Sequence, residues 1–176
     1  PPFALRDTAG EIRRLDEFTG DKALLVAFIC NHCPFVQHLL DGLVDFAREY
    51  MPKGVQVVAI SSNDPADFAE DDLPQMRAMA ESHAFPFPYL RDETQDVALA
   101  YGAICTPDLF LYDGAMKLAY CGQFDPSRPG LGRLECHGHR LGIPHRHPHL
   151  VAGIHQPLHH MPPDEPGAPE HRGDLP

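Results

Sequence analysis

Apolar residues follow two different periods in the first part of the chain. Residues 22–30 contain the continuous run Ala-Leu-Leu-Val-Ala-Phe-Ile, which is typical of a strand buried on both faces. From Pro34 to Tyr50 the apolar residues recur at helical spacing, and residues 55–61 form a second apolar run after Gly54. This order predicts a βαβ unit with two parallel strands and a right-handed crossover.

The remaining patterns are shorter. Residues 3–5 and 12–14 predict an opening hairpin, and residues 74–83 and 95–101 predict two helices. Residues 109–112 and 117–120, joined by Asp113-Gly114, predict a second antiparallel hairpin. This arrangement resembles the thioredoxin fold, an α/β fold with a central mixed sheet flanked by helices. Its active site would lie at the carboxyl end of the first βαβ strand.

The pattern changes after about residue 130. Nine of the twelve histidines lie from His137 onward, among prolines, glycines and arginines, with no sustained helical or strand period. We therefore expect a thioredoxin-like domain over residues 1–130 and a His/Pro-rich, disordered tail over residues 131–176. The tail histidines could bind a transition metal, but solvated histidines without a metal are the default expectation.

Composition excludes several partner classes. The chain has 176 residues, 43% of them hydrophobic, and a formal charge of -11. This charge argues against nucleic acid and anionic membranes, which need clustered Lys and Arg. No apolar run reaches the roughly 20 residues that span a bilayer. The five cysteines do not form a secreted disulfide framework, and we expect a cytoplasmic protein. No signal sequence is visible, although the chain opens at Pro1 without Met.

The pair Cys30 and Cys33 lies where the first buried strand gives way to the helix. Pro34 favours the first helical position and so places Cys33 at the N-cap, where unpaired N–H groups stabilise a thiolate. We expect Cys33 to be the attacking thiol and Cys30 its resolving partner. The alternatives are two inert thiols, or a zinc site with His32 and His38; otherwise His32 tunes thiol acidity or is exposed.

A second candidate feature is Cys105-Thr106-Pro107, just before an apolar strand. The Thr106–Pro107 peptide bond is expected to be cis, with an ordinary trans proline as the alternative. In a thioredoxin-like fold this turn faces the redox cysteine and presents backbone groups to a substrate chain. Cys105 is then a second possible resolving thiol.

Several motifs in order carry a family resemblance: CNHCPFV (30–36), AISSND (59–64), FPFPYLRDETQ (85–95), CTPD (105–108) and GQFDPSRP (122–129). Together they resemble the peroxiredoxin-like redoxins of the alkyl hydroperoxide reductase/thiol-specific antioxidant type, a branch of the thioredoxin superfamily. The resemblance implies thiol oxidoreductase or antioxidant activity without a cofactor or metal. The implied partners are a protein disulfide or hydroperoxide and a cellular thiol reductant. Arg128, within a family-like motif, is a candidate for stabilising a thiolate or oxyanion; the alternative is a surface arginine.

The sequence departs from the family pattern in three places. Cys30 stands three residues before Cys33, where peroxiredoxins have Thr or Ser. Val36 stands where thioredoxins have their second cysteine. The tail replaces a further helix, an abrupt change of the kind that a shifted reading frame produces. Of the other cysteines, Cys121 is expected to be a core or edge thiol without chemistry, and Cys136 an exposed thiol prone to oxidation.

Two hypotheses follow. In the first, the protein is a thiol-dependent enzyme in which Cys33 attacks a disulfide or a peroxide and Cys30 resolves the product. In the second, a redoxin fold binds a partner chain or thiol ligand at the proline turn with little turnover. The Thr or Ser missing from the peroxidase motif keeps the second hypothesis open.

Removal of residues 131–176 tests the domain assignment. Because the apolar period ends before this segment, we expect truncation to leave the thermal melting temperature nearly unchanged. Circular dichroism of the full and truncated chains measures this. A loss of many degrees would instead mean that the segment packs on the sheet in place of the family's helix.

Overall fold

The structure, a computed structural model, describes residues 1–19, 22–125, 127 and 129. Seven strands form one sheet, and they are β1 (Ala4–Asp7), β2 (Ile12–Arg14), β3 (Ala23–Phe28), β4 (Val55–Ser61), β5 (Tyr89–Arg91), β6 (Asp108–Asp113) and β7 (Leu118–Gly122). The helices are α1 (Pro34–Tyr50), α2 (Leu73–Ser82), α3 (Asp96–Tyr101) and the 3-10 turns η1 (Leu15–Phe18), η2 (Met51–Lys53) and η3 (Ala69–Asp71).

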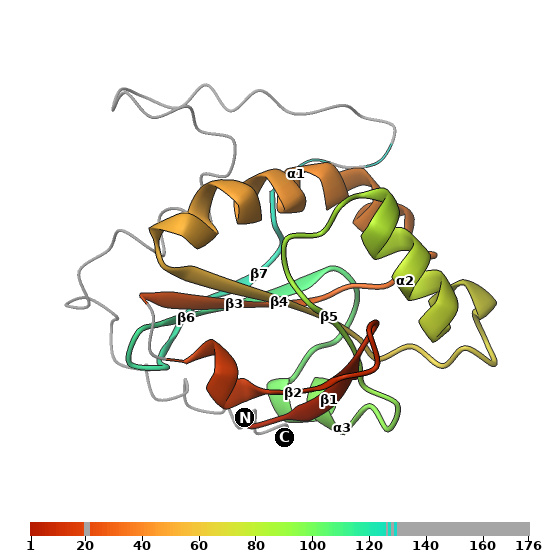
Figure 1. Cartoon of the computed structure of the whole chain (residues 1–176), viewed down its shortest axis with the longest axis horizontal. Helices are drawn as coiled ribbons and strands as arrows, with labels where there is room; N and C mark the ends of the chain where they lie inside the picture. Colours follow the sequence, from red (N-terminus) through yellow and green to blue (C-terminus); the bar gives the residue numbers. More distant parts are fainter. Residues whose placement is uncertain (20–21, 126, 128, 130–176) are drawn as a thin grey trace, which may run out of the picture.

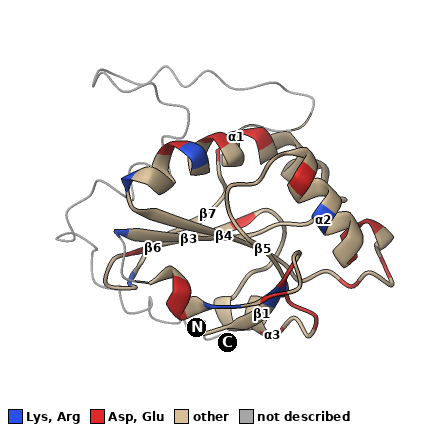
Figure 2. Ribbon diagram, in the orientation of Figure 1, with Lys and Arg blue, Asp and Glu red and all other residues tan. Residues whose placement is uncertain are grey.

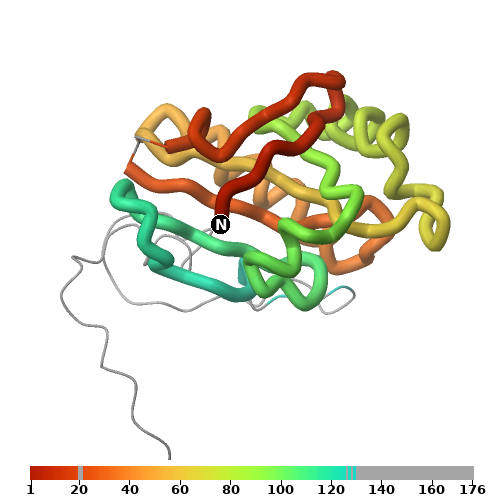
Figure 3. The backbone as a smooth tube through the Cα atoms, turned by 90° about the horizontal axis from the view of Figure 1, so that it is seen from below, coloured from red at the N-terminus to blue at the C-terminus, as the bar shows by residue number. Residues whose placement is uncertain are grey.

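The sheet is mixed, with the strand order β2-β1-β5-β4-β3-β6-β7. Strand β3 is parallel to β4, and β4 is parallel to β5, whereas every other neighbouring pair is antiparallel. Figure 3 shows the N-terminal hairpin at one edge and the β6–β7 hairpin at the other. The predicted βαβ unit and both predicted hairpins are therefore confirmed.

Strand β3 is buried on both faces, as its apolar run predicted. Ala23, Leu25 and Ala27 belong to the core beneath α1 and α2, whereas Leu24 and Val26 belong to the core on the α3 side. Successive side chains point to opposite faces of a strand, so a six-residue apolar run supplies both cores at once. Figure 1 shows α1 and α2 on one side of the sheet and α3 on the other.

Helix α1 begins at Pro34 and ends at Tyr50, the bounds that the periodicity predicted. Its buried side chains, which include Leu40, Leu43 and Phe46, face the sheet. Figure 2 shows acidic residues on α1, α2 and the loops, while β3 and β4 carry no charged residue. The buried side chains hold α1 against the sheet along its length, so its first turn is fixed near the carboxyl end of β3.

One strand was not predicted from the sequence, and some expectations concern residues outside the described part of the chain. Strand β5 was not predicted, because it spans three residues and follows a Pro-rich segment. The expected tail, with Cys136, lies outside the described residues, as does Arg128. No helix among the described residues has the length and apolarity to cross a membrane.

The contrast between two leucines tests this packing. Leu43 of α1 is 0% exposed and Leu99 of α3 is 75% exposed. We expect Leu43→Ala to lower the free energy of unfolding by about 2–5 kcal/mol, because it leaves a cavity in the core. The matched Leu99→Ala variant should change it by less than about 0.5 kcal/mol. Urea denaturation measures both, and similar losses would contradict the assignment of α1 to the core.

Candidate active site

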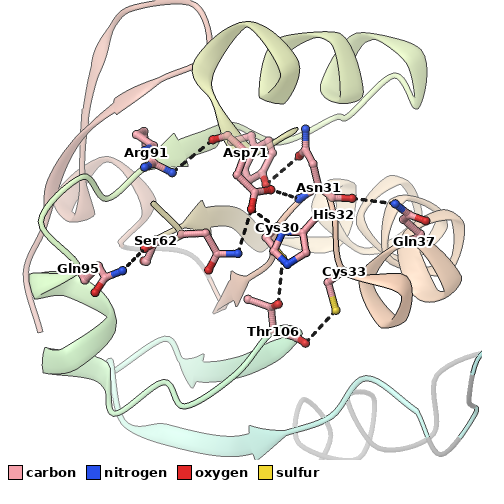
Figure 4. Close-up of polar contacts among 12 residues, drawn as sticks. Cys30, Asn31, His32, Cys33, Gln37, Ser62, Asp71, Arg91, Gln95 and Thr106 are labelled. Carbon is pink, nitrogen blue, oxygen red and sulfur yellow. Dashed lines mark hydrogen bonds and ion pairs between the residues drawn. The ribbon is translucent and has the colours of Figure 1, made fainter. Parts of the chain in front are cut away.

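Three segments meet at the carboxyl end of β3. In the sheet, Phe28 lies opposite Ile60 of β4 and Asp108 of β6. The loop from β3 to α1 is therefore flanked by the segment after β4 and by the segment before β6. These segments carry Cys30 and Cys33, then Asp71, and then Thr106 (Figure 4). The two cysteines and the proline turn come together as predicted from the sequence.

Cys33 is the N-cap residue of α1, as predicted. Its backbone is extended, with φ -71° and ψ 119°, and its carbonyl accepts the first helical hydrogen bond from the Gln37 amide at 3.0 Å. Its side chain makes no capping hydrogen bond; instead Sγ donates to the Thr106 carbonyl at 3.3 Å. The thiol is partly exposed and lies at the end of the helix where N–H groups lack helical partners.

Cys30 lies in a different environment, two residues beyond β3. Its side chain is fully buried, and Sγ lies 3.0 Å from the Thr106 hydroxyl oxygen. Burial disfavours the thiolate and raises the pKa of Cys30 to about 11, although the Thr106 hydroxyl partly offsets this by hydrogen bonding. Cys30 is therefore a neutral thiol near pH 7, in contrast to a nucleophile poised to attack.

The remaining sequence expectations concern the Thr106–Pro107 bond, Cys105, Cys121 and Arg128. The Thr106–Pro107 peptide bond is cis, as predicted. Cys105 is exposed, and the four described cysteines are all free thiols. Cys121 is exposed on β7 at the sheet edge, which confirms its expected edge position. Arg128 cannot be placed beside the thiols, because it lies outside the described residues.

Asp71 is a site residue that the sequence patterns did not single out. Its carboxylate is fully buried, and it accepts from the Asn31 amide at 2.6 Å and from the Asn63 side chain at 3.0 Å. The Asp71 oxygen that bonds Asn63 also lies 2.6 Å from Nδ1 of His32. The only sequence signal is an acidic, Pro-containing loop after β4, which does not tell which carboxylate turns inward.

His32 is held on two sides. In addition to the contact with Asp71, its ring stacks on Phe68, with ring centroids 3.8 Å apart and planes 4° from parallel. Its side chain keeps 26% exposure. Hence His32 is neither free in solvent nor part of a pair with His38, whose Nε2 lies 2.9 Å from the Ser127 hydroxyl.

One group of side chains in the described part has the composition of a metal site. Ligand atoms of Cys30, His32 and Asp71 lie within 4.8 Å of one another, and thiolate, imidazole and carboxylate are all zinc ligands. Both Asp71 oxygens are, however, already used by Asn31, Asn63 and His32. The geometry is that of a saturated hydrogen-bond network.

Comparisons with known proteins identify the family and the fold. Residues 1–121 match the AhpC/TSA family. The chain belongs to this family. Membership of the AhpC/TSA family supports a thiol-based redox role at the level of the family. The comparison with curated proteins returns no match.

Two solved structures are similar in sequence as well as in fold. An uncharacterized conserved protein from Geobacillus kaustophilus shares 50% identity and a TM-score of 0.74, over 76% of this chain and 71% of that chain. A hypothetical protein from Sinorhizobium meliloti 1021 shares 49% identity and a TM-score of 0.74, over 76% of this chain and 73% of that chain.

A more distant structure establishes the fold. A secreted disulfide oxidoreductase of Mycobacterium tuberculosis is 18% identical with a TM-score of 0.57, over 66% of this chain and 79% of that chain. At this identity the likeness concerns architecture. The predicted thioredoxin-like α/β fold, with a mixed sheet flanked by helices, is thereby confirmed.

The contrast between the two thiols yields a labelling prediction. In the reduced protein at pH 7, we expect iodoacetamide to modify Cys33 well before Cys30, and Cys30 alkylation to rise with pH toward its pKa of about 11. Thr106→Val, which removes the hydroxyl that favours the thiolate, should move Cys30 alkylation to still higher pH. Peptide mass spectrometry measures both thiols.

Thr106→Ser is the matched control, because it keeps a hydroxyl at the same position. It should leave the pH dependence of Cys30 labelling close to that of the wild type. Faster labelling of Cys30 than of Cys33 at neutral pH would reverse the roles assigned to the two thiols.

Proposed function

We propose that this protein is a thiol–disulfide oxidoreductase in which Cys33 attacks a substrate disulfide and Cys30 resolves the mixed disulfide. One observation carries the proposal: Cys33 is partly exposed at the start of α1, and Cys30 is buried behind it. Thr106 contacts both thiols, at 3.3 Å and 3.0 Å. An accessible thiol with a sheltered thiol beside it suits two-step exchange.

The exchange proceeds in two steps. The Cys33 thiolate attacks one sulfur of the substrate disulfide, and the other sulfur leaves as a thiolate that takes up a proton. Cys30 then loses its proton and attacks Cys33 Sγ, which forms the Cys30–Cys33 disulfide and releases the second substrate thiol. The substrate is reduced by two electrons, the cysteine pair is oxidised, and a cellular dithiol returns the pair to the reduced form.

The surroundings of Cys33 favour a polypeptide disulfide over a peroxide. The Thr106 carbonyl beside Sγ is a backbone acceptor that an extended substrate chain can pair with. Large apolar side chains near the thiols in sequence or in space are exposed. Phe35, two residues after Cys33, is 47% exposed; Phe68, which stacks on His32, is 43% exposed; and Ile104, two residues before Thr106, is 92% exposed. A hydroperoxide needs none of these, and Cys30 occupies the place of the family's peroxide-orienting hydroxyl.

The remaining assignments from the sequence belong to this proposal. We assign residues 1–130 to the redoxin domain and residues 131–176 to the His/Pro-rich tail, which lies outside the described residues. Cys105, exposed beside the proline turn, is an alternative resolving thiol for Cys33. Arg128 would stabilise a thiolate or an oxyanion. Thiol reductants and disulfide substrates are the expected partners.

Substitution of each cysteine tests the roles. We expect Cys33→Ser to abolish insulin reduction, because the attacking sulfur is gone. Cys30→Ser should accumulate a mixed disulfide on Cys33, because nothing resolves it. Turnover is followed by insulin turbidity, and adducts are followed by mass spectrometry of the intact protein. Cys121→Ser, at the sheet edge, is the matched control and should keep wild-type turnover.

Hydroperoxide consumption by the same variants separates the remaining hypotheses. Cys33-dependent peroxide turnover with no insulin reduction would assign the protein to the peroxidases. Reversible Cys30–Cys33 oxidation without turnover in either assay would support the binding module. Trapping of substrate by Cys33→Ser would overturn the assigned order of attack.

A further inference from the structure

The His32–Asp71 pair has no role in the exchange as described so far. It lies against the thiol that the exchange leaves protonated: ligand atoms of Cys30, His32 and Asp71 are within 4.8 Å of one another. Asp71 comes from η3, about 40 residues along the chain from the cysteine loop, yet its carboxylate is completely buried there. A buried carboxylate needs hydrogen-bond partners, and Asn31 and His32 of the cysteine loop contact it.

We propose that His32, oriented by Asp71, is the base that removes the proton from Cys30 when Cys30 resolves the mixed disulfide on Cys33. The inference rests on the proposed thiol–disulfide exchange and adds to it the route of one proton. In these terms His32 is a proton acceptor and Asp71 is a positioning residue.

The hydrogen bond between His32 and Asp71 selects the form of the imidazole. A carboxylate that also receives the Asn31 and Asn63 N–H groups accepts a proton-bearing Nδ1, which leaves Nε2 as the basic nitrogen of the neutral ring. The same carboxylate stabilises the imidazolium that forms on proton uptake. Stacking on Phe68 at 3.8 Å fixes the plane of the ring.

Cys30 needs such a base. Its pKa of about 11, raised by burial, leaves only a small fraction as thiolate near neutrality, yet the thiolate is the form that attacks. One ring nitrogen of His32 lies within 4.8 Å of Sγ, so a small ring movement or one bridging water would bring the basic nitrogen into contact with the thiol. His32 keeps 26% exposure, so the proton can leave to solvent or to the departing thiolate.

The other titratable groups of this site come from η3, the β3–α1 loop and β5. They are Asp71 of η3, Cys30 and Cys33 of the β3–α1 loop, and Tyr89 and Arg91 of β5. Tyr89 donates to the Asn31 side chain at 3.2 Å, and burial raises its pKa beyond the physiological range. Arg91 donates to the Asp71 backbone carbonyl at 3.3 Å. Both side chains act as donors in these contacts, so His32 is the ring beside Cys30 that can accept a proton.

The proton and electron balance of the step is closed. Cys30 gives its proton to His32, and its thiolate attacks Cys33 Sγ. The Cys30–Cys33 bond forms while the bond from Cys33 to the substrate sulfur breaks. The substrate thiolate then takes the proton from the imidazolium, which restores neutral His32.

His32→Gln is the principal test, in the full chain. Acid-quenched samples analysed by peptide mass spectrometry give two rates: formation of the Cys33 adduct, and its conversion to the Cys30–Cys33 disulfide. We expect conversion at pH 7 to slow by at least about tenfold and adduct formation to change less than about threefold. Asp71→Asn should act in the same direction.

The pH dependence separates a base from a merely structural residue. In the wild type, where a side chain removes the proton, conversion should level off as pH rises instead of following the hydroxide concentration. In His32→Gln it should keep rising about tenfold per pH unit until pH approaches the Cys30 pKa of about 11, because hydroxide then ionises the thiol. The control is a second His–Asp pair, His83 and Asp41, whose Nδ1 and carboxylate lie 3.3 Å apart on the surface. His83→Gln should leave both rates unchanged.

Several results would overturn the inference. They are a wild-type conversion rate in His32→Gln, equal slowing of both steps, or slowing with an unaltered pH profile. Loss of wild-type conversion after treatment with a chelator would assign the group to a metal instead. Should Asp71→Asn fail to fold, His32→Gln alone decides. If wild-type protein forms no Cys33 adduct, the proposed function fails; if it does and the variants match it, only this inference fails.

Discussion

The pairing of β3 with β4 on one side and β6 on the other is the constraint on which the site depends. Because β3 is buried on both faces, its register with its neighbours is strongly specified, and a slip by one residue would move every side chain of β3 into the opposite core. That register places Phe28 opposite Ile60 and Asp108. The cysteine loop, the acidic loop and the proline turn are far apart in sequence, but they consequently meet at the carboxyl end of β3.

Convergence gives two chemically similar thiols different environments. Cys33 has the end of a long helix and partial exposure, whereas Cys30 has burial and a single hydroxyl partner. The difference arises from position relative to the strand and the helix, since the residues are only three apart. Thr106 links the two environments, because its hydroxyl contacts one sulfur and its carbonyl the other.

The sequence was informative wherever a periodic pattern or a local rule determines the structure. The bounds of α1, the N-cap position of Cys33, the parallel β3–β4 pair and the cis bond before Pro107 all follow from such rules. Asp71 does not, because its role depends on tertiary placement. The acidic loop also offers Asp64, Asp67 and Glu70, all of them exposed, and nothing in the local pattern distinguishes the one that turns inward. Strand β5 is too short to show a period.

The contact between Cys33 and Thr106 has a consequence for recognition. As a thiol, Cys33 occupies the Thr106 carbonyl with its S–H group. A thiolate has no hydrogen to donate, so ionisation of Cys33 vacates this backbone acceptor. With Cys33 ionised, the Thr106 carbonyl is free to accept a main-chain N–H beside the sulfur. Under the proposed function, main-chain recognition of the substrate and activation of the sulfur would therefore follow from the loss of the same proton.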